Sequence, residues 1–275
     1  RKGAENGILI KSGEALETTH HVKTILFDKT GTITKGKPVV TDIILAENMD
    51  KNLLLFLAAS AEKATEHPLG EAIVKEDEIV GIDLVEPSIF ESFPGLGINA
   101  ILKGTEVSLG NEEFFKQLNI DISKFKLISD NLASKGKTPV YIANDRIFLG
   151  IIAIEDTVKP ASASAIQKLN KLGLNMVMLT GDSKLTAQAI ANQVGIANVI
   201  SEVLPHEKAH YVKMLQSKEH KVAMVGNGIN DALALAQADI GFVMGSGTDI
   251  AMKSADIILM NNDLQLLMSR IDLSK

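Results

Sequence analysis

The sequence predicts an α/β protein in which a doubly wound parallel sheet carries an inserted α+β domain. Two observations favour the sheet: from about Ile147 onward short apolar runs alternate with helical patterns, and Thr24–Phe27 adds a similar run near the other end. A third favours the insertion, because the alternation is lost over residues 41–149. We therefore expect a discontinuous domain of residues 1–40 and 150–275 around an inserted domain of residues 41–149.

The strands expected in the parallel sheet are short and apolar, as strands buried on both faces are. They are Thr24–Phe27, Asn175–Thr180, Val199–Ile200, Val222–Val225 and Ile240–Met244. After the second, Gly181–Ser183 offers a turn and an N-cap to a helix that ends at Gly195. The apolar face of this helix comprises Leu185, Ala189, Ile190 and Val194. The next helix starts at Pro205 and carries Val212 and Leu215.

The insertion is expected to combine helices with short strands. Two helices come first, and a series of short strands follows from Ser88 to Leu109. A helix near Ser123–Ser134 then leads to a hairpin turned at Asn144-Asp145. This order of elements is typical of an α+β domain rather than of a continued βαβ repeat.

The composition excludes several classes of function. The 34 acidic and 28 basic residues give a net charge of 28 − 34 = −6, and with 4% aromatics and no Trp the chain is not expected to bind nucleic acid. The absence of Cys excludes disulfides, thiolate metal sites and a cysteine nucleophile. The most apolar stretches, Leu53–Ala61 and Ile147–Ile154, are shorter than the ~20 residues that cross a bilayer.

Three ends of the predicted parallel strands carry polar residues. In an open α/β sheet ligands bind beyond the carboxyl ends of the strands, and here those ends are Asp28–Thr32, Thr180–Asp182 and Gly226–Asp231. Each segment alone is explained equally well as an ordinary turn or cap. Together with a lysine at Lys208 they are hard to obtain by chance, and they predict one shared pocket.

The residue types in this pocket suit phosphoryl transfer. An ionised Asp28 at a strand end is a competent nucleophile toward phosphorus, because such a reaction needs little more than in-line placement. Thr180, the backbone N–H of Gly181 and Lys208 can donate to phosphate oxygens. Magnesium prefers oxygen ligands, for which Asp28 and Asp231 are candidates.

The run Asp-Lys-Thr-Gly-Thr at residues 28–32 resembles the phosphorylation signature of P-type ATPases, within the haloacid-dehalogenase-like superfamily. The similarity extends through Thr180–Asp182, Lys208 and the Gly226–Asp231 turn, and includes Asp-Thr-Val-Lys-Pro at 156–160. It implies a phosphorylation domain that uses Mg²⁺ and ATP to form an aspartyl-phosphate at Asp28. The catalytic residues it implies are Asp28, Lys208, Thr180, Gly181 and Thr30, and the metal ligands are Asp28, Thr30, Asn227 and Asp231.

The insertion resembles the nucleotide-binding domain of the heavy-metal-transporting branch of that family. Glu-His-Pro-Leu-Gly at residues 66–70 is similar to its His-Pro motif, and a Glu before the pair favours copper. A lone His on a helix is ordinarily only a core or surface residue, but here further matching positions accompany it. The resemblance implies that Glu62 and His67 meet adenine, that glycines let the backbone approach the nucleotide, and that Asn111 completes the pocket. The implied nucleotide-binding residues are Glu62, His67, Gly95, Gly97, Ile98 and Asn111.

One residue departs from the family pattern. The turn at residues 226–231 normally begins Gly-Asp-Gly, whereas Asn227 stands here in place of the Asp. Removing a unit charge about 4 Å from another can matter by up to ~4 kcal/mol at an effective dielectric of 20, before solvent reduces it. We expect weaker magnesium binding and slow or partial turnover.

Three other functions compete with this interpretation. A soluble phosphatase of the same superfamily usually has a second Asp two residues after the nucleophile, where this chain has Thr30, which protonates a leaving group poorly. A nucleotide-binding module without catalysis is made plausible by Asn227. The run His206–His210 fits the H-E-x-x-H zinc-protease pattern, but no third ligand follows and Lys208 would bring a cation between the two His.

The ends of the chain suggest a longer parent. Residues 3–16 resemble the segment that leaves the membrane in this family, residues 262–274 resemble the approach to the next span, and the chain lacks an initiator Met. The partners implied are ATP and the transmembrane and actuator domains of the same parent, with the transported metal bound elsewhere in it. We expect a monomeric fragment at the cytoplasmic face of a membrane.

Overall fold

The computed structural model describes residues 7–65, 67–81, 83–216 and 220–267. The chain forms two compact units, one of residues 1–36 with 157–275 and the other of residues 37–156. Three sequence expectations fall wholly or partly outside the described residues: Glu66 of the His-Pro motif, and the outer parts of the two terminal segments.

The first unit is built on a seven-stranded sheet with the order β1-β13-β12-β11-β2-β9-β10. Neighbouring strands are parallel except for β1 with β13. The strands are β1 (Ile8–Ile10), β2 (Val22–Asp28), β9 (Asn175–Leu179), β10 (Asn198–Ile200), β11 (Lys221–Gly226), β12 (Ile240–Met244) and β13 (Ile257–Leu259). The early strand β2 lies between β11 and β9, so its expected place in this sheet is confirmed.

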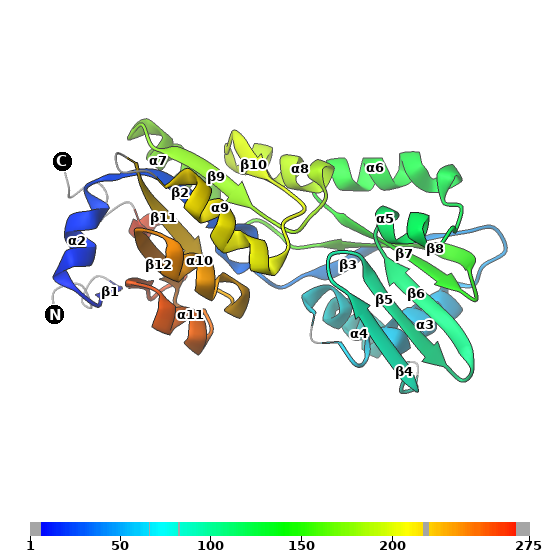
Figure 1. Ribbon diagram of the computed structural model, residues 1–275. Helices are drawn as coiled ribbons and strands as arrows, with labels where there is room; N and C mark the ends of the chain where they lie inside the picture. The colour runs from blue at the N-terminus through cyan, green and yellow to red at the C-terminus, as the bar shows by residue number, and fades with distance from the viewer. Residues whose placement is uncertain (1–6, 66, 82, 217–219, 268–275) are drawn as a thin grey trace. The chain divides into compact units, whose positions relative to one another are not determined.

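Helices cover both faces of this sheet, which confirms the doubly wound architecture (Figure 1). Successive residues of β2 point to opposite faces, so that Ile25 and Phe27 join one apolar cluster and Leu26 joins the other. Helices α2 (Gly13–Thr19), α7 (Ser162–Lys171) and α8 (Lys184–Val194) pack on the first cluster. Helices α9 (Lys208–Leu215), α10 (Ala232–Gln237) and α11 (Asp249–Ser254) pack on the second.

Helix α8 shows how the local sequence sets its ends. The Ser183 hydroxyl accepts a hydrogen bond from the N–H of Thr186, and Gly195 ends the helix in the left-handed conformation, both as predicted. The predicted apolar face is wrong at Leu185, which is 46% exposed. Thr186 and Ala187 are buried instead, because the helix is turned so that its small residues face the sheet.

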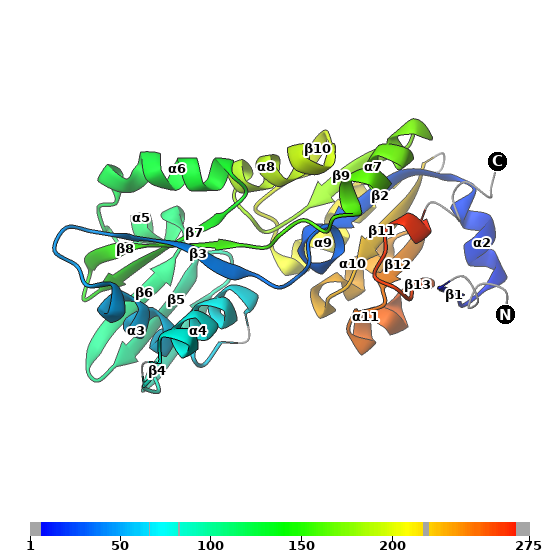
Figure 2. The same ribbon diagram turned by 180° about the vertical axis from the view of Figure 1, so that it is seen from behind.

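The second unit is a six-stranded antiparallel sheet with the order β3-β8-β7-β6-β5-β4. The strands are β3 (Val39–Leu45), β4 (Ile89–Phe93), β5 (Gly97–Leu102), β6 (Thr105–Gly110), β7 (Thr138–Asn144) and β8 (Ile147–Glu155). Helices α3 (Lys51–Glu62) and α4 (Pro68–Val80) cover one face, and α5 (Glu112–Gln117) and α6 (Lys126–Ser134) cover the other (Figure 2).

This unit differs from the sequence prediction in the position of the β7–β8 turn and in its boundaries. The turn residues are Asp145 and Arg146, both with positive φ (46° and 64°), one position later than predicted. Strand β3 pairs with β8, so residues 37–40 and 150–156 belong to the antiparallel unit, whereas the sequence boundaries assigned them to the parallel one. An apolar run gives the same sequence pattern in a parallel and in an antiparallel sheet, and the predicted boundaries therefore differ from the observed ones.

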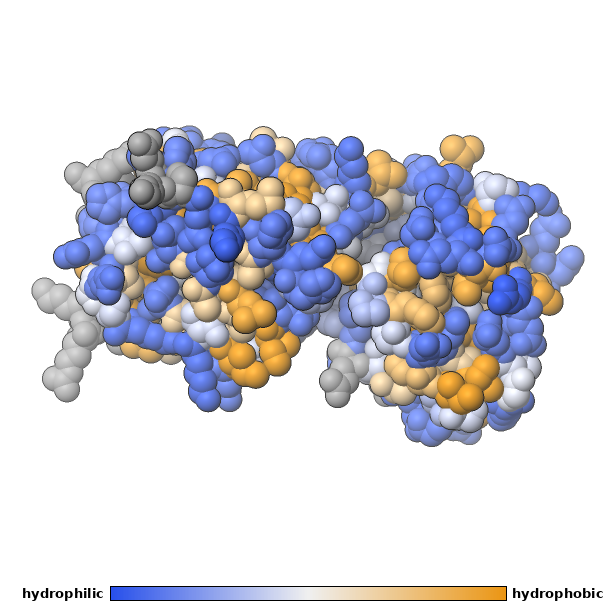
Figure 3. Space-filling model, in the orientation of Figure 1, coloured by the Kyte–Doolittle hydropathy of each residue, from blue (hydrophilic) through white to orange (hydrophobic). Residues whose placement is uncertain are grey.

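On the face seen in Figure 3, apolar residues occur at several separate places among hydrophilic ones. Within the described ranges, none of the helices has the length and apolar character needed to span a bilayer.

Candidate active site

Asp28 ends β2 and lies beside the ends of two other strands. It is the register partner of Leu179 at the end of β9, and the preceding Phe27 is the partner of Val225 in β11. The segments after β2, β9 and β11 therefore start side by side at one edge of the sheet, as the sequence predicted. Asp28 itself is only 4% exposed.

Lys208 joins Asp28 to Asp231. Its ammonium nitrogen lies 2.6 Å from Oδ1 of Asp28 and 2.8 Å from Oδ1 of Asp231. Lys208 begins α9, and Asp231 ends the short 3-10 turn Ile229–Asp231 after β11. All three side chains are buried, so one lysine balances two carboxylates where water is largely excluded.

The charges of this triad shift one another's protonation. Burial, and then the negative charge of Asp231, raises the pKa of Asp28 to about 7. The positive charge of Lys208 acts in the opposite direction. Burial disfavours the charged form of Lys208, but the two carboxylates outweigh it and raise its pKa above the ordinary value. The carboxyl group of Asp28 therefore changes between its neutral and ionised forms near neutral pH.

The loop after Asp28 is a tight turn that needs glycine. Gly31 has φ +74°, and a Cβ there would lie 1.8 Å from Nδ2 of Asn227. The Thr34 hydroxyl accepts a hydrogen bond from the N–H of Gly31. The Lys159 ammonium donates to the carbonyl oxygen of Gly31 at 2.7 Å. The side chain of Asn227 therefore lies directly against the turn, and Lys159 ties the segment 156–160 to it.

The second strand end is held by its own hydrogen bonds. The Thr180 hydroxyl donates to Oδ2 of Asp182 at 2.9 Å, and Oδ2 also forms an ion pair with Lys29 at 2.7 Å. The N–H of Asp182 donates back to the Thr180 hydroxyl. The pair of Lys29 and Asp182 connects the turn after β2 with the turn after β9, and sequence reasoning assigned neither residue a role. Their position directly after strand ends was the available signal.

The residues implied as magnesium ligands offer oxygen atoms of the kind that Mg²⁺ binds. Mg²⁺ usually takes one or two carboxylates and completes its shell with phosphate oxygens and waters. Asp28, Thr30 and the Asn227 amide supply such oxygens beside the turn. Asp231 is more committed, because its Oδ2 accepts from the N–H groups of Asn227 and Gly228 while Oδ1 binds Lys208. The set fits Mg²⁺ through the carboxylate of Asp28, whose Oδ1 also accepts from Lys208, and Asp231 orients the turn.

In the second unit, Thr65 connects Glu62 with His67. The Thr65 side chain hydrogen-bonds to the Glu62 carboxylate and accepts from the backbone N–H of His67 at 3.2 Å. Nδ1 of His67 accepts from the N–H of Leu69, so the exposed imidazole caps the start of α4. Sequence reasoning missed Thr65, although a hydroxyl between two predicted ligands was a usable signal.

The remaining residues predicted to bind the nucleotide form a second group. Asn111 caps α5 by accepting from the N–H of Phe114, and its amide donates to the carbonyl of Gly95 at 2.7 Å. A Cβ at Gly97 would lie 2.1 Å from the carbonyl oxygen of Leu109, so protein packing alone already requires glycine there. Ile98 is 7% exposed and belongs to the core beneath α3 and α4.

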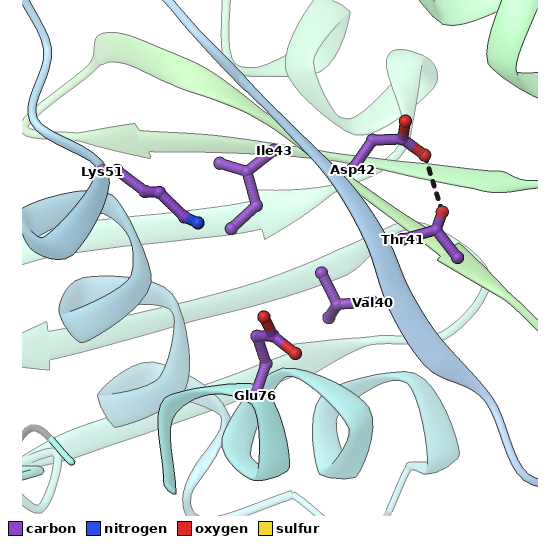
Figure 4. A pocket seen from close by; sticks show the side chains of 6 residues that line it. All are labelled: Val40, Thr41, Asp42, Ile43, Lys51 and Glu76. Atoms are coloured by element: carbon purple, nitrogen blue, oxygen red, sulfur yellow. Dashed lines mark hydrogen bonds between the residues drawn. The ribbon is translucent and has the colours of Figure 1, made fainter. Parts of the chain in front are cut away.

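The cavity beside Glu62 and Thr65 is not lined by the second group. A cavity of about 200 Å³ is lined by Glu62, Lys63, Thr65, Glu71, Val74 and Lys75, and none of the second group lines it. Another of about 150 Å³ lies between β3, α3 and α4 (Figure 4). There Lys51 and Glu76 extend toward Val40 and Ile43, while Asp42 is hydrogen-bonded to Thr41. It contains none of the predicted site residues.

The zinc-protease pattern at residues 206–210 does not form a metal site. His206 and His210 are exposed, and the Glu207 carboxylate accepts from the N–H of Leu204 as a helix cap. No cluster of three or more His, Cys, Asp or Glu suited to a metal occurs among the described residues. Lys208, the cation within the pattern, is the residue that binds Asp28.

Comparison with known proteins gives the chain its relatives. It is 47% identical over 274 residues to a copper-exporting P-type ATPase of Staphylococcus saprophyticus and 44% identical over 274 residues to copper-transporting ATPase 1 of Rhizobium meliloti. All of the chain is covered in both cases, but it spans only 34% and 33% of the two relatives.

Two solved structures are similar over nearly the whole chain. The catalytic domain of the CPx-ATPase CopB-B matches with a TM-score of 0.78 at 28% identity, covering 98% of this chain and 96% of that one. A zinc-transporting PIB-type ATPase in an E2.Pi state matches with a TM-score of 0.69 at 39% identity, covering 99% of this chain and 44% of that one. The family model of haloacid dehalogenase-like hydrolases matches residues 22–239. The chain belongs to the haloacid dehalogenase-like hydrolase family.

Proposed function

We propose that this chain is the catalytic part of an ATP-driven heavy-metal exporter, most simply a copper exporter, and that Asp28 accepts the γ-phosphate of ATP. The observation that carries the proposal is the triad in which Lys208 binds both Asp28 and Asp231 at the ends of neighbouring strands. The names of the copper-transporting relatives, which match this chain over its whole length, support the choice of transporter.

In the proposed reaction an ionised Asp28 oxygen attacks the γ-phosphorus in line with the leaving group. A new O–P bond forms while the bond to the β,γ-bridging oxygen breaks, and ADP leaves with that electron pair. Lys208 keeps the attacking carboxylate in place and offers positive charge to the phosphoryl oxygens. The N–H of Gly181 is a proposed donor at the neighbouring strand end, and the Thr180 hydroxyl would become a second donor by giving up its hydrogen bond to Asp182.

Magnesium would neutralise phosphate charge when bound, and Asp28, Thr30 and Asn227 are the residues that would hold it. We propose that the second unit binds ATP through Glu62 and His67. The neighbouring Gly95, Gly97 and Asn111 would give the pocket its shape, and Ile98 would support it from the core.

The parent would supply what this chain lacks for transport. We propose that transmembrane and actuator domains of the same protein bind the metal and drive hydrolysis of the aspartyl-phosphate. In the chain alone the aspartyl-phosphate would then be long-lived, because Thr30 cannot replace the Asp that phosphatases use as acid and base. This unit would work at the cytoplasmic face of the membrane.

Substrate preference tests the proposal against the phosphatase alternative. The 275-residue chain is given MgATP, MgADP and p-nitrophenyl phosphate in separate reactions, and bound phosphate and released phosphate are both measured. We expect labelling from ATP with little release. Rapid hydrolysis of p-nitrophenyl phosphate without a preference for nucleotides would identify a phosphatase instead.

A further inference from the structure

We infer that Glu62 reads the nucleotide base as a neutral carboxylic acid, and that it thereby selects adenine over guanine in a manner that weakens as the pH rises. The inference rests on the proposed function, because it requires ATP to bind in the second unit. It goes further in assigning the protonation state of one side chain and the base preference that follows.

The carboxyl group of Glu62 is almost removed from water and lies at the wall of a cavity. Glu62 is the last residue of α3, is 8% exposed, and lines the cavity of about 200 Å³. Gly70 in α4 lies so close that a Cβ there would be 2.4 Å from Oε2 of Glu62. The carboxyl group is thus enclosed on the α4 side and faces the cavity.

Among the described residues, no cation forms an ion pair with the Glu62 carboxyl group. The Thr65 hydroxyl hydrogen-bonds to it. Lys63, at the cavity rim, pairs with Glu86 at 2.7 Å. The other charged side chains at the rim are Glu71 and Lys75, both exposed on α4, and the exposed His67 follows Thr65 in the connection.

Strands β5, β6 and β7, which lie beneath α3, place no charged side chain beside Glu62. Strand β5 contains no titratable residue, and Tyr141 of β7 packs in the aromatic cluster on the opposite face. Glu106 of β6 alternates with Val107, which belongs to the α3 face, so Glu106 points to the other face. With these surroundings, burial raises the pKa of Glu62 to about 7.

The protonation state decides which base the carboxyl group complements. A carboxylic acid has one O–H donor and a carbonyl acceptor, which match N1 and the N6 amino group of adenine. A carboxylate only accepts, and it matches the N1–H and N2 amino donors of guanine instead. The Thr65 hydroxyl leaves a second lone pair on the oxygen to which it donates, so it orients the group without blocking it.

The expected pH effect follows from the fraction of neutral Glu62. If only the acid form binds adenine, the apparent affinity falls with that fraction, by about tenfold between about pH 6 and about pH 8 for a pKa of about 7. For guanine the trend reverses.

The test measures dissociation constants of ATP and GTP by calorimetry at about pH 6 and about pH 8, for the wild-type chain and for Glu62→Gln. The amide of Gln donates and accepts as the carboxylic acid does but does not titrate. We expect the roughly tenfold loss of ATP affinity in the wild type to vanish in Glu62→Gln, which keeps its preference for ATP over GTP at both values. Because both proteins meet the same ATP, ionisation of its phosphates cancels in the comparison.

Glu47→Gln replaces an exposed residue of the same unit and is the matched control. Its ATP affinity should depend on pH as that of the wild type does. Thermal melts of all three proteins show that each is folded. Equal pH dependence in the wild type and Glu62→Gln would overturn the inference while ATP binding stood. Absence of ATP binding in every protein at both pH values would overturn the proposed function with it.

Discussion

Lys208 donates a hydrogen bond of 2.6 Å to Asp28 across 180 positions of the chain. Both residues are buried, at 9% and 4% exposure, and Asp231 shares the same ammonium group. Asp28, the proposed phosphate acceptor, is therefore held by a residue that begins a distant helix. The predictions below start from this pair.

Replacing Lys208 should destabilise the fold as well as the chemistry. In Lys208→Met, Asp28 and Asp231 lose their shared cation, and the free energy of unfolding should fall by about 3 kcal/mol. Urea denaturation at neutral pH measures it. Lys213→Met, on the exposed side of the same helix, is the control and should change stability by less than ~0.5 kcal/mol. An equal effect of the two substitutions would contradict a buried triad.

The stability of the chain should depend on the protonation of Asp28. Because burial raises its pKa to about 7 in the folded state, the folded protein binds more protons than the unfolded chain between about pH 4 and about pH 7. Stability therefore declines as the pH rises through that window. In Asp28→Asn the decline should be shallower by up to ~1.4 kcal/mol per pH unit.

The measurement is a series of denaturation curves across that window, with the exposed Asp83→Asn as the control. Glu62 contributes a decline of the same sign in both proteins, since its pKa is also raised to about 7, so the difference between them isolates Asp28. Parallel curves for Asp28→Asn and the control would refute the raised pKa.

Gly31 should tolerate no side chain. In Gly31→Ala the new Cβ meets Asn227 and the positive φ is strained, and we expect a loss of about 2–3 kcal/mol. Gly173→Ala isolates the strain, because Gly173 has φ +76° with no atom within 4 Å of the added Cβ, and should lose only about 1 kcal/mol. If the two variants melt alike, Asn227 does not lie against the turn.

Asn227→Asp should tighten magnesium binding. A second carboxylate beside Asp28 adds attraction for the cation, and we expect at least a tenfold lower midpoint, about 1.4 kcal/mol, after solvent screening. Magnesium titrations of phosphoenzyme formation and, independently, magnesium-induced shifts in melting temperature provide the readouts. Unchanged midpoints in both would show that the residue at 227 does not face the metal.

The sequence predicted the parallel sheet and its active-site edge because both depend on local patterns. The apolar run Thr24–Phe27 ends directly at Asp28, and the buried runs of β9 and β11 end in equally distinctive turns. Parallel strands bring such ends together whatever the loops do. The adjacent placement of the three strand ends is therefore the part of the site that sequence reasoning obtained.

The contacts that tune the site could not be predicted in this way. The ion pair of Lys29 with Asp182 and the bond from Lys159 to Gly31 join segments far apart in the chain, and nothing local specifies them. The boundary of the antiparallel unit was misjudged for a similar reason, since β8 is as apolar as a buried parallel strand. The antiparallel pairing of β8 with β3 is what distinguishes β8 from a strand of the parallel sheet.

The central claim, that Asp28 accepts the γ-phosphate of ATP, is tested most directly by labelling. The wild-type chain and Asp28→Asn are incubated with saturating magnesium and ATP labelled at either the γ- or the α-phosphate, and then quenched in acid. The account predicts an acid-stable, hydroxylamine-labile label from γ-labelled ATP in the wild type only. Equal labelling of Asp28→Asn, or no label on the wild type at saturating magnesium, would contradict it.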